Sequence, residues 1–373
     1  MKVLHLMCGA PYGGVERQAE RLAGVLKRAG VEQRVLLCGP PARAKNFEAL
    51  GIQGNTIEFP SRFAFMDRRR INTVIRRFEP DVVISWTPDV AAYVKKDGFI
   101  HLARLGTQFD HELLLNKCHH IFTPSQTRAD AAMRAGWSVQ QVHVLPHVPM
   151  TPEEIAEKAI NRKAVFTPPT SNLIFTAMRL TQKAGLETLL DAVARLSGYY
   201  LWIAVNGADR EALEAAAHER GVKPRVRFLG WQDKLGPYIS ACDVFVYPSK
   251  QDDVGDAITE AWACGAPVIA ADSLGPGLLI RHNENGMLVP VSAANSMAEA
   301  IKLLTQNPEQ AKRLGAAGRA AFAETFAMDK VGPQYMSLLE RITAKPAAGE
   351  APRTLASLRP GDSLLGIPSG ATH

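Results

Sequence analysis

The sequence lacks any run of about 18 uncharged apolar residues, so it predicts no membrane-spanning helix. It also lacks the apolar core and small-residue cleavage site of a secretory signal peptide, because the N-terminal M-K-V-L-H-L-M leads directly into a glycine loop. Its 5 cysteines are scattered and form no C-x-x-C pair. We therefore expect reduced thiols in a cytoplasmic protein, with neither a disulfide framework nor a zinc site.

The signatures of three other kinds of site are also missing. No complete G-x-G-x-x-G with a well-placed acidic residue follows the first strand, which counts against NAD binding. No G-x-S-x-G and no Cys–His pairing is evident, so nucleophilic hydrolysis is not supported. The histidines show no helical metal spacing with a third ligand, and we predict no metal site.

The charge that is present is unevenly spread. Residues 1–150 contain 20 Lys and Arg against 13 Asp and Glu, whereas the remainder contains 23 against 24. The sharpest basic cluster combines Arg68-Arg69-Arg70 with Arg76-Arg77. Two interpretations stay open: a solvated helix face, or contact with anionic lipid head groups or an acidic acceptor. No nucleic-acid module accompanies the charge, so no nucleic-acid partner is predicted.

Length and pattern indicate two α/β domains. The 373 residues, of which 46% are apolar and 21% charged, suit a globular protein of two or three domains at about 150 residues each. Apolar strands alternate with amphipathic helices in both halves, which is typical of doubly wound, Rossmann-like domains. We expect an N-terminal domain, a proline-rich linker, a C-terminal domain, a final helix that packs back on the first domain and a disordered tail: 1–150, 151–170, 171–327, 328–343 and 344–373.

The most informative stretch is Asp252–Gly265, D-D-V-G-D-A-I-T-E-A-W-A-C-G. An expected buried strand precedes it, Gly255 gives a flexible backbone point, and a helical pattern follows. A helix N-terminus after a glycine loop favours an anion such as a phosphate. The carboxylates of Asp252 and Glu260, eight residues apart, suit the hydroxyl groups of a ribose or a sugar. A nucleotide-sugar is therefore the first hypothesis.

Several other loops at expected strand ends carry candidate residues. Arg179 and Lys183 lie four residues apart, where two cations could clamp a diphosphate. Gly14 belongs to P-Y-G-G, which opens the first helix. Trp231 could line a nucleobase pocket or simply pack at a domain edge. The segment 275–277, G-P-G, is either a ligand-facing loop or a turn.

These motifs, taken in order, resemble the GT4 family of retaining glycosyltransferases, which have the GT-B fold. The resemblance rests on R-L-T-Q-K-A-G-L, P-S-K-Q-D-D-V-G-D-A-I-T-E-A-W-A-C-G and N-E-N-G-M-L-V-P in the second half, and on P-Y-G-G-V-E-R near the N-terminus. It implies two Rossmann-like domains whose parallel sheets face a central cleft. The middle of the first half matches poorly.

The resemblance also implies roles for single residues. Glu260 matches the second acid of the family's E-x7-E motif, which binds the nucleotide ribose. Asp252 stands where the first Glu contacts the transferred sugar, a departure that shortens the acid by one methylene. The remaining donor-binding matches are the diphosphate-holding pair and the glycine-loop positions: Arg179, Lys183, Gly14, Val254 and Gly255.

A second departure concerns catalysis. Many family members carry a histidine after a strand in the middle of the first domain, whereas this chain reads L-A-R-L-G-T-Q-F-D-H-E, with Gly106 at about that place. Asp110, His111 and Asp89 are the candidates to replace it, beside Asp252.

The function implied is transfer of a hexose from a UDP- or GDP-sugar to a glycan or lipid-linked acceptor, with retention and without a metal. The nucleotide-sugar is a substrate, so no cofactor is expected. The setting implied is lipopolysaccharide or other envelope polysaccharide biosynthesis, at the inner face of the cytoplasmic membrane. The alternatives are a sugar-nucleotide 2-epimerase of the same fold and a non-catalytic partner that binds a nucleotide-sugar.

Overall fold

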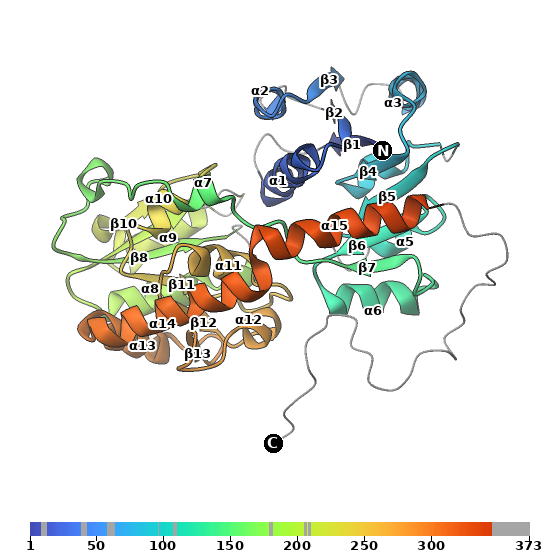
Figure 1. The fold of residues 1–373 in the computed structure, drawn as a ribbon. Coiled ribbons are helices and arrows are strands. Elements are labelled where there is room, and N and C mark those ends of the chain that lie inside the picture. Colours follow the sequence, from blue (N-terminus) through green and yellow to red (C-terminus); the bar gives the residue numbers. More distant parts are fainter. Residues whose placement is uncertain are drawn as a thin grey trace. The chain divides into compact units, whose positions relative to one another are not determined.

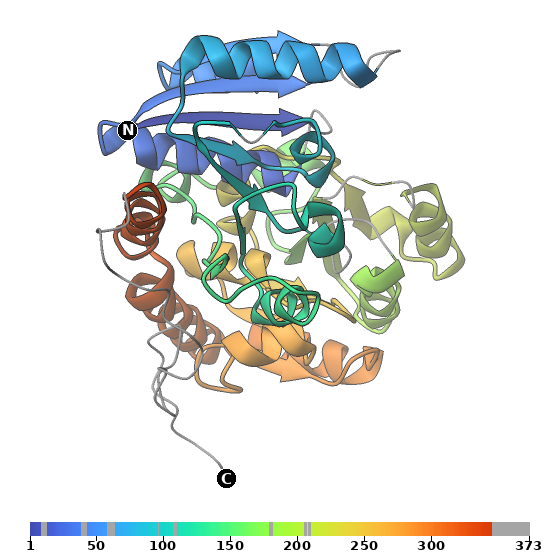
Figure 2. The same ribbon diagram turned by 90° about the vertical axis from the view of Figure 1, so that its right-hand side faces the viewer.

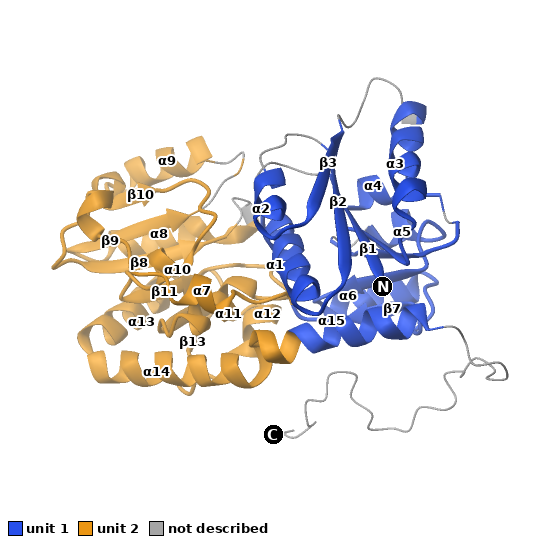
Figure 3. Ribbon diagram, turned by 45° about the horizontal axis from the view of Figure 1, so that its top comes forward, with its two compact units in different colours: residues 1–146, 332–373 blue, residues 147–331 orange. Residues whose placement is uncertain are grey.

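The computed structural model describes residues 1–8, 13–38, 43–57, 64–95, 97–106, 110–178, 182–204, 207 and 210–344. The chain divides into two units, which Figure 3 colours separately: unit 1 is Met1–Pro146 with Gly332–His373, and unit 2 is His147–Val331. The chain therefore passes between the units twice. The tail expected to be disordered lies, from residue 345 onward, outside the described residues.

Unit 1 is built on a seven-stranded sheet in the order β3-β2-β1-β4-β5-β6-β7. All neighbouring strands pair in parallel. The strands are β1 Lys2–Cys8, β2 Glu32–Cys38, β3 Gln53–Ile57, β4 Val82–Ser85, β5 Ile100–Arg104, β6 His120–Thr123 and β7 Val142–Val144. The helices are α1 Gly14–Arg28, α2 Ala44–Ala49, α3 Ala64–Phe78, α4 Pro88–Ala91, α5 Asp110–Leu114, α6 Gln126–Arg134 and, from the end of the chain, α15 Met328–Thr343.

Helices cover both faces of this sheet, and Figure 2 shows α1 and α3 on opposite sides of it. Leu4 and Leu6 of β1 belong to one buried cluster with Ile71 and Ile75 of α3. Such burial on both faces explains why the strands are nearly continuous apolar runs. Gly30, which follows α1, has φ 76°, the left-handed conformation that is common just after the end of a helix.

A buried chain of polar side chains crosses the centre of the unit 1 sheet. The indole Nε1 of Trp86 donates to Nδ1 of His5 at 3.2 Å, and Nε2 of His5 lies 3.0 Å from Oε1 of Gln33. The Nε2 group of Gln33 in turn donates to the Ala23 carbonyl at 3.1 Å. His5 is completely buried, and this burial lowers its pKa to about 4, so the ring is neutral at physiological pH.

The C-terminal helix α15 packs on the β6–β7 edge of unit 1. The Tyr335 ring meets the Phe122 ring edge-on, and its hydroxyl donates to the Pro146 carbonyl at 2.8 Å. Further along the helix, Nη2 of Arg341 lies 3.3 Å from Nδ1 of His143. Burial first, then the charges of His120 and Arg341, lower the pKa of His143 to about 3. These contacts join residues that lie between 189 and 213 positions apart in the sequence.

Unit 2 repeats the architecture with a six-stranded parallel sheet in the order β10-β9-β8-β11-β12-β13. Figure 1 shows its helices around the strands. The strands are β8 Asn172–Ala177, β9 Tyr199–Ala204, β10 Val226–Phe228, β11 Val244–Tyr247, β12 Val268–Ala271 and β13 Met287–Val289. The α-helices are α7 Pro152–Ile155, α8 Leu186–Ala194, α9 Arg210–Glu219, α10 Gly236–Ile239, α11 Asp256–Ala263, α12 Leu274–Leu279, α13 Ala294–Gln306 and α14 Pro308–Ala321. The 3-10 segments are η2 Arg162–Val165, η3 Gln182–Ala184 and η4 Lys223–Arg225, and η5 Phe322–Phe326 is a π-helical turn.

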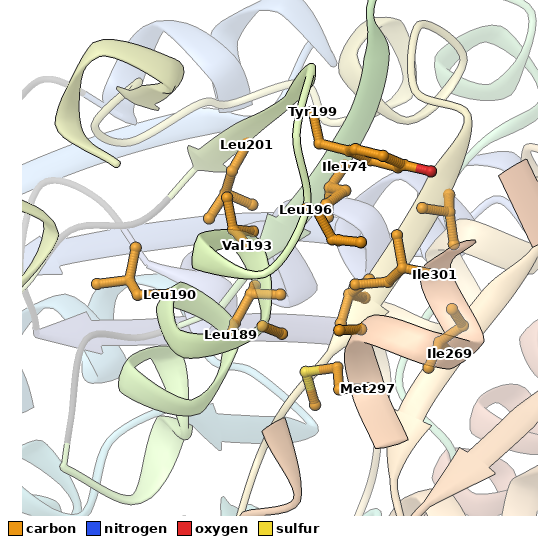
Figure 4. Packing of buried hydrophobic residues seen from close by; sticks show 14 of the residues in the cluster. Ile174, Leu189, Leu190, Val193, Leu196, Tyr199, Leu201, Ile269, Met297 and Ile301 are labelled. Carbon is orange, nitrogen blue, oxygen red and sulfur yellow. The ribbon is translucent and has the colours of Figure 1, made fainter. Parts of the chain in front are cut away.

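The core of unit 2 lies in two layers, one on each face of its sheet. Figure 4 shows one layer, where Leu189 and Val193 of α8 meet Ile301 and Met297 of α13. The other layer contains the buried indoles of Trp202 and Trp262. The residues expected to form a linker also fold here, since Arg162 donates to the Asp243 carboxylate at 2.8 Å.

The position of a ligand site follows from the two strand orders. In each sheet the first strand of the unit is central, and the order reverses beside it: between β1 and β4 in unit 1, and between β8 and β11 in unit 2. In open α/β sheets, ligands bind outside the carboxyl ends of the strands at such a reversal. This rule favours the loops after β1, β4, β8 and β11 as the ligand-binding loops.

The structure corrects one sequence prediction, that all thiols are reduced. Cys8 and Cys38 form a disulfide, with their Cα atoms 4.4 Å apart. The two residues are direct partners in the parallel register of β1 and β2. Their separation of 30 residues carries no such signal in the sequence, because the pairing depends on strand register. No helix in the described ranges is long and apolar enough to span a bilayer.

Candidate active site

The loop between β11 and α11 has the strand–loop–helix geometry expected of the Asp252–Gly265 stretch. Gly255 is the N-cap of α11 and adopts a left-handed conformation with φ 78°. A Cβ atom at this position would lie 2.8 Å from Cδ1 of Leu279. Backbone strain and close packing therefore both favour glycine here.

The Asp252 carboxylate is held inside this loop. One oxygen accepts from the Val254 N–H at 3.0 Å, and the other accepts from the Gly255 N–H at 3.0 Å and from the Tyr247 hydroxyl. The side chain is consequently oriented before any ligand arrives. The same bonds engage the two backbone amides that the family resemblance assigns to the donor.

The α12 segment supports the loop from behind. The Gly275 N–H donates to the Asp252 carbonyl at 2.7 Å, and a Cβ atom at Gly275 would lie 2.5 Å from the Val254 nitrogen. The G-P-G sequence at 275–277 is thus part of a short helix packed on the loop between β11 and α11. Its glycine permits the close approach of two backbones.

Glu260 lies on α11, where 7% of its surface is exposed. Burial raises the pKa of the neighbouring Cys264 thiol to about 12, and the negative charge of Glu260 adds to the effect. Cys264 is consequently protonated and unreactive at neutral pH.

An ion pair holds the first residue of α11. Nδ1 of His147 contacts a carboxylate oxygen of Asp256, and 44% of the Asp256 side chain remains exposed. His147 is the first residue of unit 2 and directly follows Pro146, whose carbonyl is bound by Tyr335. Pro146 is therefore held by a residue of unit 1, and His147 by the first residue of α11 in unit 2.

The loop after β8 contributes Lys183, which lies on η3 with an exposed side chain. Its carbonyl accepts from the Lys250 N–H, in the loop after β11, at 2.9 Å. Gly185 follows with φ 70°, and a Cβ atom there would collide with the Pro248 carbonyl oxygen. The two loops at the strand-order reversal are thus locked together. Arg179, the other predicted diphosphate residue, lies outside the described residues.

Trp231 follows β10 and is half-buried. Its Nε1 group donates to the Asp233 carboxylate at 2.7 Å. The carboxylate fixes the orientation of the indole within its own loop.

In unit 1, Gly14 begins α1 and is exposed. A Cβ atom at Gly14 would meet nothing within 4 Å, whereas one at Gly13 would collide with the Glu16 carboxylate. There is therefore no room for a side chain at Gly13 without moving Glu16, whereas there is room for one at Gly14.

Gly106 stands at about the place where many family members carry a histidine, and two charged side chains bond to its backbone. The Gly106 N–H donates to the Asp110 carboxylate at 3.0 Å, and its carbonyl accepts from the Arg128 guanidinium. A Cβ atom at Gly106 would lie 2.8 Å from that carboxylate. The Asp110 carboxylate thus accepts a hydrogen bond from the backbone of Gly106 and supports the loop there.

The other two catalytic candidates lie on short helices. His111 is on α5 with 8% of its surface exposed, and its Nδ1 atom has no hydrogen-bond partner among the described residues. Asp89 is exposed on α4, just after β4. Across the described residues, no group of three or more His, Cys, Asp or Glu side chains could hold a metal ion.

Comparison with known proteins matches both halves of the chain. The family described as "Glycosyltransferase Family 4" matches residues 12–148, and "Glycosyl transferases group 1" matches residues 157–321. The lipopolysaccharide core biosynthesis glycosyltransferase LpsE of Rhizobium meliloti is 30% identical over 91% of this chain and 99% of its own length. LpsD of the same organism is 28% identical over 92% and 100%.

The chain belongs to the family 4 glycosyltransferases.

Solved structures place this glycosyltransferase in the GT-B fold. Anabaena Alr3699/HepE, in complex with UDP and glucose, superposes with a TM-score of 0.76 at 19% identity, covering 91% of this chain and 100% of its own. WaaG, a glycosyltransferase involved in lipopolysaccharide biosynthesis, superposes with a TM-score of 0.68 at 15% identity, covering 91% and 99%. The predicted family and the predicted fold of two parallel-sheet domains are confirmed.

Sequence reasoning missed three features of the glycosyltransferase site. These are the ion pair of His147 with Asp256, the backbone bond that brings Lys250 to Lys183, and the internal bonds of Asp252. The ion pair and the backbone bond join residues more than 60 positions apart. The bonds of Asp252 are local, and an Asp before V-G at a helix start is a signal that could have indicated them.

Proposed function

We propose that this glycosyltransferase moves a hexose from a UDP- or GDP-sugar to a glycan or lipid-linked acceptor, with retention of configuration, in lipopolysaccharide or other envelope polysaccharide biosynthesis. The observation that carries the proposal is the similarity to LpsE and LpsD along nearly their whole length. A GDP-mannose-dependent mannosyltransferase of Mycobacterium tuberculosis matches at 30% identity over 43% of the chain. With HepE, which binds UDP, it leaves both nucleotides open.

The proposed donor site is the strand-order reversal of unit 2. Glu260 would accept hydrogen bonds from the ribose hydroxyls, and Asp252 would orient the transferred sugar. Arg179 and Lys183 would bind the diphosphate, and the assignment of Gly14 to the donor stays a prediction from the family resemblance. Charge on the departing diphosphate would be met by cations and amides, so the proposed reaction needs no metal.

The hydrogen bonds of Asp252 affect how a donor could bind at this loop. The Val254 and Gly255 amides already donate to its carboxylate, so they could reach a donor oxygen only after the carboxylate moves. We expect donor binding to exchange these partners. His111, with its unpartnered ring nitrogen, is the proposed catalytic-site residue in place of the usual histidine, and Asp110 and Asp89 are the alternatives.

The proposed setting is the inner face of the cytoplasmic membrane, and the outer face of α3 is the surface for it. Phe65 is 69% exposed there, and the neighbouring arginines 68, 69, 70, 76 and 77 are exposed too. Near an anionic leaflet each such cation contributes about 1 kcal/mol to binding. Sedimentation with phosphatidylglycerol vesicles tests this: wild type should bind, phosphatidylcholine vesicles should not retain it, and Arg69→Ala with Arg70→Ala should weaken binding.

A thermal-shift screen with UDP, GDP and ADP tests the donor site. A nucleotide at 100 times its dissociation constant stabilises the folded state by about 2.7 kcal/mol. We expect Glu260→Ala and Lys183→Ala to weaken nucleotide binding, whereas Asp252→Asn should chiefly reduce turnover. Stabilisation by none of the nucleotides would refute the donor site. Release of an altered free sugar without an acceptor would identify an epimerase, and binding without turnover on any acceptor would identify a non-catalytic partner.

A further inference from the structure

Lys250 is a cation to which the family motifs assign no role. It follows β11 directly after Pro248 and Ser249 and is half-buried. Its N–H donates to the Lys183 carbonyl at 2.9 Å, across the two loops that flank the strand-order reversal. The backbones of two lysines, 67 positions apart in the sequence, are therefore held side by side at the place where an open α/β sheet binds its ligand.

The side chain of Lys250 passes over Gly185, a position where any side chain would collide with the backbone. An ideal Cβ atom at Gly185 would lie 3.5 Å from Cγ of Lys250 and would collide with the Pro248 carbonyl. Gly185 is also the N-cap of α8, a nine-residue helix. The stem of Lys250 thus passes the N-terminal end of that helix, whose partial positive charge disfavours an ammonium group without a counter-ion.

No counter-ion for either lysine is found in the described part of unit 2. Neither Lys183 nor Lys250 forms an ion pair there, whereas Lys223 and Lys234 pair with Glu214 and Glu157. Two like charges and a positive helix end repel one another unless an anion is bound between them. The nearest acid along the chain, Asp252, is engaged with its own loop.

We propose that Lys250 is a donor-binding residue that, together with Lys183, contacts the phosphate groups of a nucleoside diphosphate. The inference rests on the proposed function, because it names a further residue of the same donor site. It also gives a physical reason for the backbone bond between the two loops, which holds the backbones from which the two lysine side chains extend close together before the ligand arrives.

Lys250→Met tests the inference, because methionine keeps an unbranched stem over Gly185 and removes only the charge. The binding of UDP and GDP to the full chain is measured by calorimetry at several salt concentrations. Loss of one charged contact to a phosphate should weaken the tighter of the two nucleotides by about tenfold or more. It should also flatten the dependence of affinity on salt, since one fewer charge is involved. Lys250→Arg should retain most of the affinity.

Lys312→Met is the matched control, because it removes the same charge from an exposed position on α14. Its nucleotide affinity should equal that of wild type. The parent nucleoside, uridine or guanosine, gives the second control: a phosphate contact predicts that Lys250→Met leaves nucleoside binding unchanged. Lys250→Gln is the substitute if the methionine variant does not fold.

Three results would overturn the assignment. Unchanged affinity and salt dependence in Lys250→Met would remove Lys250 from the site and leave the proposed donor intact, since wild type still binds. Equal loss for nucleotide and nucleoside would show that Lys250 only supports the loop. Absence of UDP and GDP binding by wild type would remove the proposed donor, and the role of Lys250 with it.

Discussion

The two units reverse their strand order at corresponding places, but the carboxyl ends of the strands there are built differently. In unit 2, Gly185 allows the loop after β8 to touch the backbone of the loop after β11, and two lysines remain without ion-pair partners in the described residues. In unit 1, the central strands β1 and β4 are joined by the bond between His5 and Trp86, and β1 is also linked to β2 by a disulfide.

The difference shows where each unit keeps its polar groups. Unit 2 has backbone contacts between the loops that carry charged groups at the strand ends, and these contacts limit how far the backbone must reorganise when an anion binds. Unit 1 has a chain of polar groups in the interior of its sheet, where His5, Gln33 and Trp86 bond to one another. The first arrangement prepares a surface for a ligand, and the second holds strands together. The two arrangements can therefore be distinguished by the effects of substitutions on ligand binding and on the free energy of unfolding.

Gly185→Ala should produce the largest effect. Alanine would have to adopt φ 70° and would collide with the Pro248 carbonyl, so the two loops must separate. Left-handed strain of about 1 to 2 kcal/mol adds to the cost of moving backbone, and we expect a loss of about 3 to 5 kcal/mol in the free energy of unfolding. Urea denaturation measures it.

Gly14→Ala is the corresponding change in unit 1 and serves as the control. Nothing lies within 4 Å of the added methyl group, and the residue is the first of a helix. Its free energy of unfolding should stay within about 0.5 kcal/mol of wild type. A small loss in Gly185→Ala would mean that the two loops of unit 2 are not locked, and the contrast between the units would disappear.

Stability should fall at acid pH because of His5. Its pKa is about 4 in the folded protein and 6.5 in the unfolded chain, so the unfolded state binds the proton first. The stabilising contribution is complete above pH 6.5 and is lost as the pH falls toward 4. Between pH 7.5 and 4.5 we expect a loss of about 2 to 3 kcal/mol from this residue. His143, with a pKa of about 3, acts in the same direction.

Urea denaturation of wild type and His5→Gln at both pH values measures the effect. The variant is less stable at pH 7.5 because the bond to Trp86 is altered, but its loss between pH 7.5 and 4.5 should be smaller by about the amount assigned to His5. Equal pH dependence in the two proteins would contradict the assignment. This test concerns the interior of unit 1 alone.

The sequence was sufficient for the fold and for the loop-and-helix geometry of the Asp252–Gly265 stretch, for physical reasons. Apolar runs and amphipathic helices report burial directly, and Asp252, Gly255 and Glu260 lie within one local segment that must form a loop and a helix. Lys250 and Lys183 meet only because β8 and β11 are neighbours in the sheet, which no local pattern encodes. Strand register likewise creates the disulfide of Cys8 and Cys38.

The place of the family's histidine was harder to interpret for a different reason. Gly106 is bound through its N–H by Asp110 and through its carbonyl by Arg128, so neighbouring charged side chains fix the backbone there. Asp110 is only four residues away and was identified as a candidate, but its support of the backbone depends on the fold of the loop. The sequence indicates which residues are close, and only the structure indicates which bonds they make.

The smallest expected effect concerns His147, which lies where the chain passes from unit 1 to unit 2. Removing its partly exposed ion pair with Asp256 should cost about 1 kcal/mol or less, so His147→Ala should fold normally. The α11 N-terminus would lose one anchor beside Gly255, and we expect nucleotide binding to weaken severalfold. Calorimetry of His147→Ala, Asp256→Asn and the double variant measures this. Because each single change breaks the same contact, the double variant should be no weaker than either one. Additive losses would show that the two residues act separately, and that the crossover at 146–147 is not coupled to the donor loop.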